Sequence, residues 1–453
     1  MAFRFMSKLF AIVAVFAFVQ IGAAQMPATS NPVAQAAKKE TSYGRHSTSV
    51  VSVAFSPDGK RVASAGGDRI KVTDLVTGKE ILKFKSTQHM NFLSVVYSPD
   101  GRWLAGSQTR LKERKTRREK DLIITTLIYV GATVIWDANT GAVIATIHED
   151  NDPAWGLAVA PDGKTLAIGT GPTTPKDKDC TKELCEGYGE VMLVDTATWK
   201  IRTRLKGKAQ PIRVLTFSPD GKRLAGSSGV MEMPRGAADN AEYEALVWDV
   251  ETGALLPQLP RHARSVTAIA FSPNGKLLAT AGRDRSLRIW QLPSMKLINT
   301  ASEFMISVEE IETITDKTDK KKAKDALPKI SWLTAVAFSE DSKTIIGCGA
   351  DGMVRFYEAA SGKISHVVKP RDWPILPWDS FWAITDPMLF NLGIQPGGLG
   401  NDPWFPSRRF PGGGFGGYMS SRGGVMNAMA MTPDGKMLVT GGADGKIRLM
   451  SVE

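Results

Sequence analysis

Cysteine and histidine are scarce in this chain, which has 453 residues but only three cysteines and five histidines. Three cysteines are too few for a disulfide scaffold. Cys180 and Cys185 lie close together in a polar segment and can form one local disulfide in an oxidising compartment, but they lack the further ligands of a metal site. Cys348 lies in an apolar strand pattern, where we expect it to be buried.

Sequence motifs of catalysis are also missing. The chain contains no Gly-x-Ser-x-Gly elbow, no His-Glu-x-x-His and no Walker-type loop. His366 stands alone, and the other histidines each precede a recurring turn, a placement that favours structural hydrogen bonding; these are His46, His89, His148 and His262. The sequence therefore predicts no enzyme, no cofactor and no metal site.

Only the N-terminus carries a continuous apolar run. Arg4 and Lys8 precede an apolar stretch, Leu9–Ile21, and three small residues follow it. This pattern is typical of a secretory signal peptide, and the run is shorter than the roughly 20 residues of a bilayer span; an uncleaved membrane anchor is the alternative. We predict a signal peptide over 1–24, a linker over 25–37, and a mature protein without transmembrane segments that is periplasmic, envelope-associated or extracellular.

The charge balance favours no single class of partner. Lys and Arg outnumber Asp and Glu, which gives a formal net charge of +11, a modest excess for this length. Such a balance permits an acidic partner or an anionic surface without requiring one. Hydrophobic residues make up 43% of the chain, enough for a sizeable core.

A four-residue turn of the type Ser-Pro-Asp-Gly recurs along the chain. Pro presets φ at the second position, Asp caps its own backbone, and Gly accepts the positive φ of the last position. Seven copies each follow a short apolar strand; they begin at Ser56, Ser98, Ala160, Ser218, Ser272, Ser339 and Thr432. Seven copies indicate one repeated supersecondary unit, which can bury its apolar faces only by stacking on its neighbours.

The fifth copy shows the unit most clearly. Its strand patterns cover 265–271, 276–282, 287–290 and 295–298. Four short antiparallel strands form a twisted sheet that needs cover on both faces. The sequence therefore predicts an all-β protein built from repeated four-stranded sheets.

The same unit resembles the WD40 repeat family. His262, Asp284 and Trp290 match the family's histidine, turn aspartate and third-strand tryptophan. Other copies match at His46, His89, Asp68, Asp351, Asp444, Trp136, Trp248 and Tyr357, whereas Thr73, Val194 and Met450 replace the aromatic residue. The resemblance implies a seven-bladed WD40 β-propeller over 38–453. It also implies that a strand within about Lys38–Arg45 completes the last blade.

The repeat spacing is uneven. Successive turns lie 42 residues (Ser56 to Ser98) to 93 residues (Ser339 to Thr432) apart, whereas a WD40 unit needs roughly 40 to 45. We place insertions between second and third strands at 108–129, 171–189 and 229–243, and between units at 308–329 and 369–424. Because strands alternate in direction, both kinds of loop leave from one face, which we predict to be the binding surface.

The longest insertion is rich in aromatic residues. Such density contradicts simple disorder, and aromatic residues dominate binding hot spots. The segment either caps the central channel, forms an exposed partner surface, or packs on itself without a partner. Our candidate contact residues here are Trp373, Trp378, Phe381, Trp382, Trp404 and Phe405.

A basic run, 112–120, lies in the first insertion and precedes 122–129, which has strong strand character. The run either binds an acidic protein, an anionic lipid surface or a polyanion, or forms a solvated hairpin or helix tip. The candidate contacts are Lys112, Arg114, Lys115, Arg117 and Arg118. Nucleic acid is not expected, because the chain carries an export signal and the run lacks aromatic residues.

Together these patterns predict an exported, non-catalytic scaffold for protein–protein interaction, whose partner the sequence does not identify. Binding of an anionic surface or polyanion through 112–120 is the second hypothesis. An enzyme with a site in the central channel is the third, and no sequence motif supports it.

Overall fold

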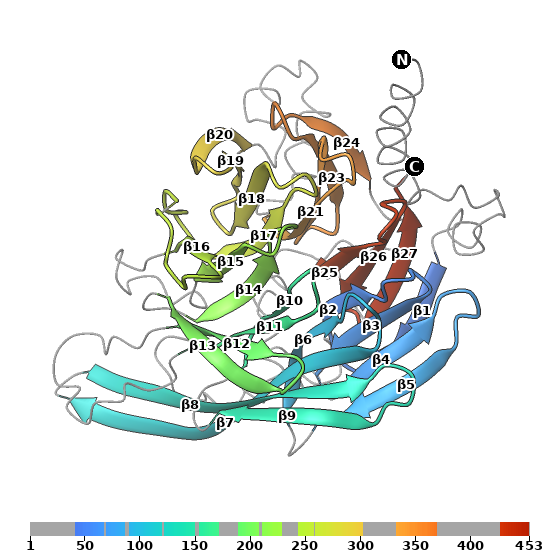
Figure 1. Cartoon of the computed structure of the whole chain (residues 1–453), viewed down its shortest axis with the longest axis vertical. Coiled ribbons are helices and arrows are strands. Elements are labelled where there is room, and N and C mark those ends of the chain that lie inside the picture. Colours follow the sequence, from blue (N-terminus) through green and yellow to red (C-terminus); the bar gives the residue numbers. More distant parts are fainter. Residues whose placement is uncertain are drawn as a thin grey trace, which may run out of the picture.

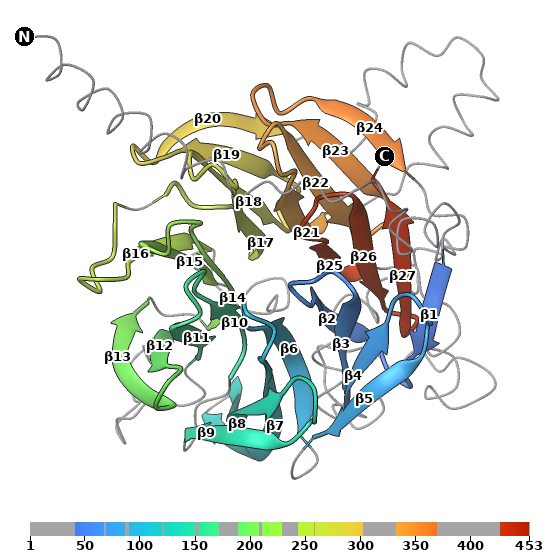
Figure 2. The same ribbon diagram turned by 45° about the vertical axis from the view of Figure 1, so that its right-hand side comes forward.

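Seven antiparallel sheets surround a common axis in the structure, which is a computed structural model (Figure 1, Figure 2). It describes residues 41–67, 69–86, 90–119, 122–149, 154–171, 189–207, 211–228, 243–257, 259–301, 332–368 and 426–452. These ranges contain strands and turns and no helix. Each sheet is one blade, numbered here 1 to 7 along the chain, so the predicted all-β seven-bladed propeller is confirmed.

The first three blades have four strands each, and strands adjacent in the chain pair antiparallel. Blade 1 contains β2 (Val50–Phe55), β3 (Arg61–Gly66), β4 (Arg69–Asp74) and β5 (Glu80–Lys85). Blade 2 contains β6 (Asn91–Tyr97), β7 (Trp103–Glu119), β8 (Leu122–Asp137) and β9 (Val143–Glu149). Blade 3 contains β10 (Leu157–Val159), β11 (Thr165–Gly169), β12 (Glu190–Asp195) and β13 (Lys200–Lys206).

Blades 5 and 6 repeat the four-stranded pattern. Blade 5 contains β17 (Val266–Phe271), β18 (Leu277–Gly282), β19 (Leu287–Gln291) and β20 (Lys296–Ala301). Blade 6 contains β21 (Leu333–Phe338), β22 (Thr344–Gly349), β23 (Val354–Glu358) and β24 (Ile364–Val368). The strand bounds of blade 5 lie within three residues of those predicted for the clearest repeat.

Blade 4 departs from the prediction of four strands per unit. Its sheet contains three strands: β14 (Ile212–Phe217), β15 (Arg223–Ser228) and β16 (Ala245–Asp249). A fourth strand begins, since Leu255 bridges Trp248 and the Leu256 amide donates to the Val247 carbonyl at 2.8 Å. It stops at once because Pro257 and then Pro260 have no N–H to donate to the ladder.

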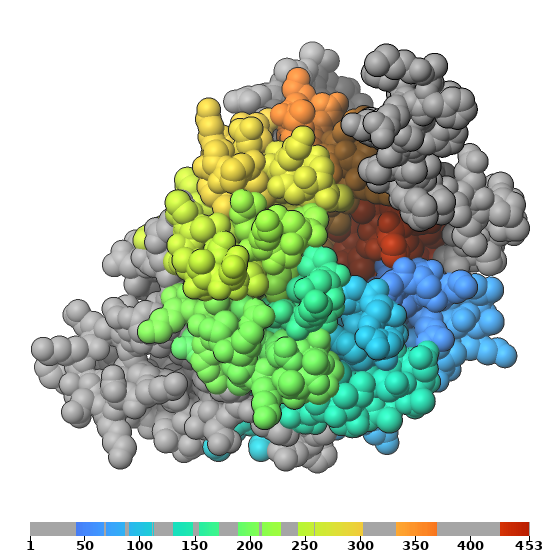
Figure 3. All heavy atoms as spheres, in the orientation of Figure 1, coloured from blue at the N-terminus to red at the C-terminus, as the bar shows by residue number. Residues whose placement is uncertain are grey.

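Blade 7 joins the two ends of the described chain. It contains β25 (Met426–Met431), β26 (Met437–Gly442), β27 (Lys446–Ser451) and, as the outer strand, β1 (Thr41–Arg45). Thr41 pairs with Leu449 and Tyr43 with Ile447. In the space-filling view the blue first blade lies beside the red last blade (Figure 3). The predicted closure by an N-terminal strand is therefore confirmed.

The core lies between adjacent blades. Ile70 and Val72 of blade 1 pack with Phe92, Leu104 and Trp136 of blade 2 in one buried cluster. Each such side chain contributes about 1.5–3 kcal/mol when it leaves water. Close packing of the blades also requires the small residue at position 106, where an added Cβ would lie 2.5 Å from Ile70 Cδ1. Stability therefore comes from stacking blade on blade, as expected for a repeat that cannot bury its own faces.

The recurring turns interlock on one face of the ring. In the first copy, Ser56 Oγ donates to Asp58 Oδ1 at 2.5 Å, and Gly59 has a φ of +67°. Neighbouring turns touch: a Cβ added at Gly101 would lie 3.5 Å from Cδ of Pro57. These turns lie beside the turns that join third to fourth strands, and we call this side the turn face.

Candidate interaction face

The opposite side of the ring, which we call the insertion-bearing face, carries the links between second and third strands and the links between blades. Antiparallel pairing within every blade places both kinds of link on this side. The predicted insertions 171–189, 229–243, 308–329 and 369–424 lie almost entirely outside the described residues. The first insertion, 108–129, lies largely within them.

That first insertion forms a two-stranded ribbon. The strand β7 has 17 residues and β8 has 16, and their pairing runs from Trp103↔Asp137 to Glu119↔Leu122. Their neighbours stop earlier, because β6 ends its pairing at Thr109 and β9 at Gly131. The ribbon is the long two-stranded arm in Figure 1. It confirms the predicted strand over 122–129, and the basic run lies in a hairpin rather than a helix tip.

Most of the basic run lies on β7, one strand of this ribbon. Lys112 is exposed and lies at a β-bulge between Leu111 and Glu113. The paired segment 122–129 has no charged residue.

Several predicted residues lie outside the described part of the chain. They are Asp68, His89, the cysteine pair Cys180 and Cys185, and the aromatic candidates Trp373, Trp378, Phe381, Trp382, Trp404 and Phe405. Their predicted roles stay predictions. Cys348 is described and buried as expected, and burial, the largest effect, raises the pKa of its thiol, so the thiol is inert at neutral pH.

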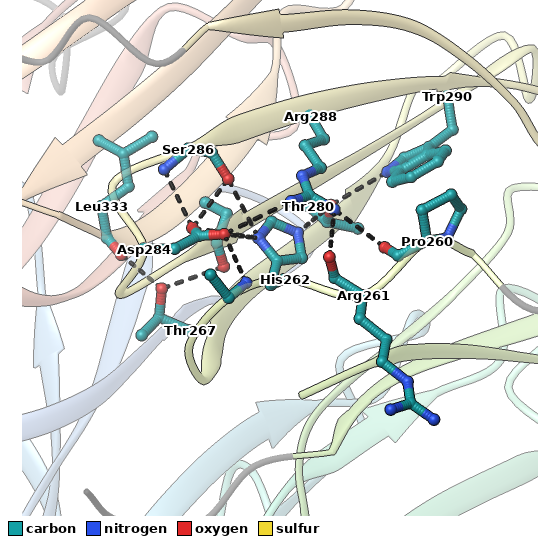
Figure 4. A network of polar contacts seen from close by, with 12 residues as sticks. Pro260, Arg261, His262, Thr267, Thr280, Asp284, Ser286, Arg288, Trp290 and Leu333 are labelled. Atoms are coloured by element: carbon teal, nitrogen blue, oxygen red, sulfur yellow. Dashed lines mark hydrogen bonds and ion pairs between the residues drawn. The ribbon is translucent and has the colours of Figure 1, made fainter. Parts of the chain in front are cut away.

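A buried polar network lies near the insertion-bearing face in blade 5 (Figure 4). His262 lies between Asp284 and Thr280, with Nδ1 3.0 Å from Asp284 Oδ2 and Nε2 2.9 Å from Thr280 Oγ1. The Trp290 indole donates to the same Thr280 hydroxyl at 3.0 Å. The network links the segment before β17 to β18, to the turn after it and to β19. Its geometry positions these strands relative to one another.

The charge of Asp284 is held by its neighbours. Burial opposes ionisation, but the hydrogen bond and charge of His262, with Ser286, keep the pKa of Asp284 far below its usual value. Arg288 Nη2 lies 3.6 Å from the carboxylate. The same guanidinium donates to the Arg261 carbonyl at 2.7 Å. The aspartate is therefore a fixed anion that organises the turn.

Blades 6 and 7 use an arginine where blade 5 uses this histidine network. Arg355 pairs with Asp351, and Arg448 Nη2 donates to Asp444 at 2.5 Å. Arg448 is only 1% exposed, so the pair replaces hydration of both charges. These arginines were not predicted from the sequence. An Asp-x-x-x-Arg spacing, shared with Asp284, was the available signal.

The remaining predicted repeat positions are distributed around the ring. His46 Nε2 lies 2.8 Å from Ser64 Oγ in blade 1. Trp248 and Tyr357 are fully buried, and Trp136 stacks 4.7 Å from Phe84. In blade 7, where Met450 replaces the aromatic residue, the buried Thr440 hydroxyl has no hydrogen-bond partner within the described ranges.

The described residues contain no group of three or more His, Cys, Asp or Glu side chains placed to hold a metal ion. They also contain no helix long and apolar enough to cross a bilayer. The chemistry that remains in the described part is that of surfaces and hydrogen-bonded turns.

A closed ring of seven antiparallel sheets with these turn networks defines a β-propeller. A family model described as "WD domain, G-beta repeat" matches residues 37–74, 253–291, 329–358 and 416–450. These four matches show WD40 repeats in the chain and support its assignment to a WD40, G-beta-like family.

Curated relatives agree with this assignment. The chain is 28% identical over 165 residues to WD repeat-containing protein SL1-17 of Schistosoma mansoni, covering 36% of this chain and 45% of the relative. It is 26% identical over 180 residues to nuclear distribution protein PAC1 of Coccidioides posadasii (37% and 34%). It is 25% identical over 262 residues to transducin beta-like protein 3 of Bos taurus (51% and 29%). The chain spans less than half the length of each of these relatives.

Proposed function

We propose that this protein is an exported, non-catalytic scaffold that binds a partner protein through the insertion-bearing face. One observation carries the proposal: the described insertion extends blade 2 as a ribbon beyond every neighbouring strand. The other four insertions leave from the same side of the ring. A rigid ring with its irregular segments on one side is the usual arrangement for binding loops.

The ribbon offers a specific mode of contact. Beyond Thr109 and Gly131 each of its strands pairs, within the described part of the chain, on one side only. Unpaired strand edges accept a further strand through main-chain hydrogen bonds. The turn face lacks this feature in the described residues, because its turns are short and satisfy their own polar groups, as Ser56 does with Asp58 and Arg61.

Deletion of 371–424 tests the aromatic part of the proposal. We expect the ring to stay folded and partner capture, assayed by crosslinking and mass spectrometry in the native envelope, to be lost. A matched variant keeps the length and replaces only Trp373, Trp378 and Trp382 by Ser. Capture that is unchanged in both variants would remove this segment from the binding surface.

Binding of an anionic surface or polyanion is the second candidate function. The strand that carries Arg114, Lys115, Arg117 and Arg118 pairs with a segment free of charge. We expect binding to anionic vesicles to fall steeply with salt, because exposed charges are screened over about 8–10 Å at physiological ionic strength. Neutralising the four residues together should abolish it. Binding that ignores both salt and neutralisation would exclude this function.

Export rests on the pattern of residues 1–24. We expect the mature protein to begin at Gln25 and to appear in the envelope or extracellular fraction. N-terminal sequencing of the purified native protein measures this directly. A native N-terminus at Met1 in the cytoplasmic fraction would contradict export and leave the scaffold proposal intact.

A further inference from the structure

A groove of about 590 Å³ opens on the turn face between blades 4 and 5. Polar residues on its wall include Arg223, Lys276 and Gln291, and apolar ones include Leu277, Leu292 and Ile298. The wall therefore comes from the start of β15, from the turn before β18, and from β19 and β20. It lies on the side of the ring opposite the proposed interaction face.

The position of Arg223 repeats that of Arg61. Each is the first residue of the second strand in its blade, β15 and β3. Arg61 Nη1 donates to the Ala138 carbonyl at 3.3 Å and to Asn139 Oδ1 at 3.2 Å, in the turn after β8 of the next blade. That arginine therefore fastens blade 1 to blade 2.

The turn facing Arg223 lacks one of these acceptors. The Leu292 amide donates to the Lys276 carbonyl just as the Ala138 amide donates to the Arg102 carbonyl. The two turns are thus in register, and Pro293 takes the place of Asn139. Proline has no side-chain acceptor. Within the described residues the Arg223 guanidinium makes no hydrogen bond or ion pair, and it lines the groove instead.

Two cations and two carboxylates lie at or near the groove. Two cations, Arg223 and Lys276, line the groove. Two carboxylates, Asp220 and Asp249, lie within electrostatic range of Arg223. Both are already bonded within their own turns, to Ser218 Oγ at 2.5 Å and to the Thr252 amide at 2.8 Å. These four charges sum to zero, so the groove has no net charge to attract a polyanion, and an anion binds here only by direct contact with one of the two cations.

The apolar wall favours an aliphatic neighbour to that carboxylate. Leu292 is buried and Leu277 half-buried, whereas Ile298 is 42% exposed at the groove. An aliphatic side chain laid on Ile298 and Leu292 would remove this surface from water. A guanidinium and a carboxylate form two parallel charge-assisted hydrogen bonds, which fix orientation as well as affinity.

We propose that this groove binds an acidic peptide segment of a partner protein, with a Glu or Asp carboxylate on Arg223 and an adjacent aliphatic residue against Leu292 and Ile298. The site is separate from the insertion-bearing face. One ring then holds two partners, one on each face.

The test measures binding of labelled hexapeptides in which one Glu is flanked by Leu, Ile or Val, each compared with its Gln counterpart. We expect Glu peptides to bind the full-length protein about tenfold or more tightly than Gln peptides, the range of one charge-assisted contact. Arg223→Gln should abolish this difference, and Ile298→Ser should weaken both peptides.

Arg61→Gln is the matched control, because its guanidinium is already engaged. It should leave peptide binding unchanged and lower Tm, whereas Arg223→Gln should leave Tm unchanged. Glu peptides that do not bind, that bind Arg223→Gln equally well, or that are outcompeted by phosphopeptides would each overturn the proposal. None of these results bears on crosslinking at the insertion-bearing face.

Discussion

At the scale of single residues, buried arginine–aspartate pairs hold the turns of blades 6 and 7. In blade 5 a network with histidine and tryptophan has this role. Arg448 is fully buried, and it forms an ion pair with Asp444. Removing one member of such a pair leaves a buried charge without compensation. The pairs in blades 6 and 7 should therefore respond strongly to single substitutions and weakly to double ones.

Arg448→Met should lower the free energy of unfolding by about 3–5 kcal/mol, the usual cost of breaking a buried ion pair. The double variant Arg448→Met, Asp444→Leu should recover most of that loss. Urea denaturation of the two single variants and the double variant measures the coupling. Additive losses would mean that the pair does not act as a unit.

Asp284 gives the fold a defined response to acid. The pKa of Asp284 in the folded state lies well below the ordinary 3.8. The contribution of its charge to the free energy of unfolding is therefore complete above about pH 4, and it is lost as the pH falls through the folded-state pKa. The stability difference between the wild type and Asp284→Asn should hold constant from pH 6 to 5 and shrink below pH 4. A difference that grows on acidification would reverse the assigned sign.

The sequence predicted the residues that recur at fixed positions in the repeat. It did not predict roles that depend on contacts with other segments. His262, Asp284 and Trp290 stood at fixed offsets from the turn, so they could be found. The role of Thr280 depends on His262, in the segment before β17, and on Trp290 of β19. The different environments of Arg61 and Arg223 depend on the turn of the next blade, which no local pattern encodes.

At the scale of elements, the ribbon of β7 and β8 is an addition to blade 2 rather than a part of its core. Among the described residues, its outer half has no neighbouring strand beyond Thr109 and Gly131. An isolated two-stranded hairpin is only marginally stable in water. The stability of the ring should therefore not depend on the ribbon.

Replacing 111–129 by Asn-Gly, the residues of a tight hairpin turn, should leave the urea midpoint within error of the wild type. The same replacement should remove the salt-dependent binding assigned to Arg114 and its neighbours. A large drop in stability would show that the ribbon packs on the ring. Replacing 277–286 in the same way is the control that should unfold blade 5, since those residues form β18 and its network.

Strand number was predicted correctly for six of the seven blades. The exception is blade 4, and its cause is visible in the sequence. Pro257 and Pro260 follow the third strand, at the place where the fourth strand should lie. The prediction of a fourth strand in blade 4 followed the repeat pattern and disregarded these prolines. A breaker within one copy should outweigh the average of the other copies.

At the scale of the whole molecule, closure of the ring depends on β1. Tyr43 is 4% exposed, and its hydroxyl donates to the Leu75 carbonyl of blade 1 at 3.0 Å. This strand thus joins blade 7 to blade 1 as well as completing blade 7. A ring closed by two ends of the chain opens if either end detaches.

Tyr43→Ala should therefore lower the free energy of unfolding by about 3–5 kcal/mol, the range for truncating a buried aromatic residue. The adjacent Ser42→Ala, at an exposed position of the same strand, should change it by less than about 0.5 kcal/mol. Equal effects at the two positions would mean that β1 does not close the ring.

The central claim is that the partner binds the insertion-bearing face. The most direct measurement places a photo-crosslinking amino acid at Lys112, exposed on β7, and in a second variant at Lys60, exposed on the turn face. Irradiation in the native envelope, followed by mass spectrometry, should yield one recurring protein adduct at position 112 and none of that protein at position 60. That adduct at position 60, with none at position 112, would contradict the account.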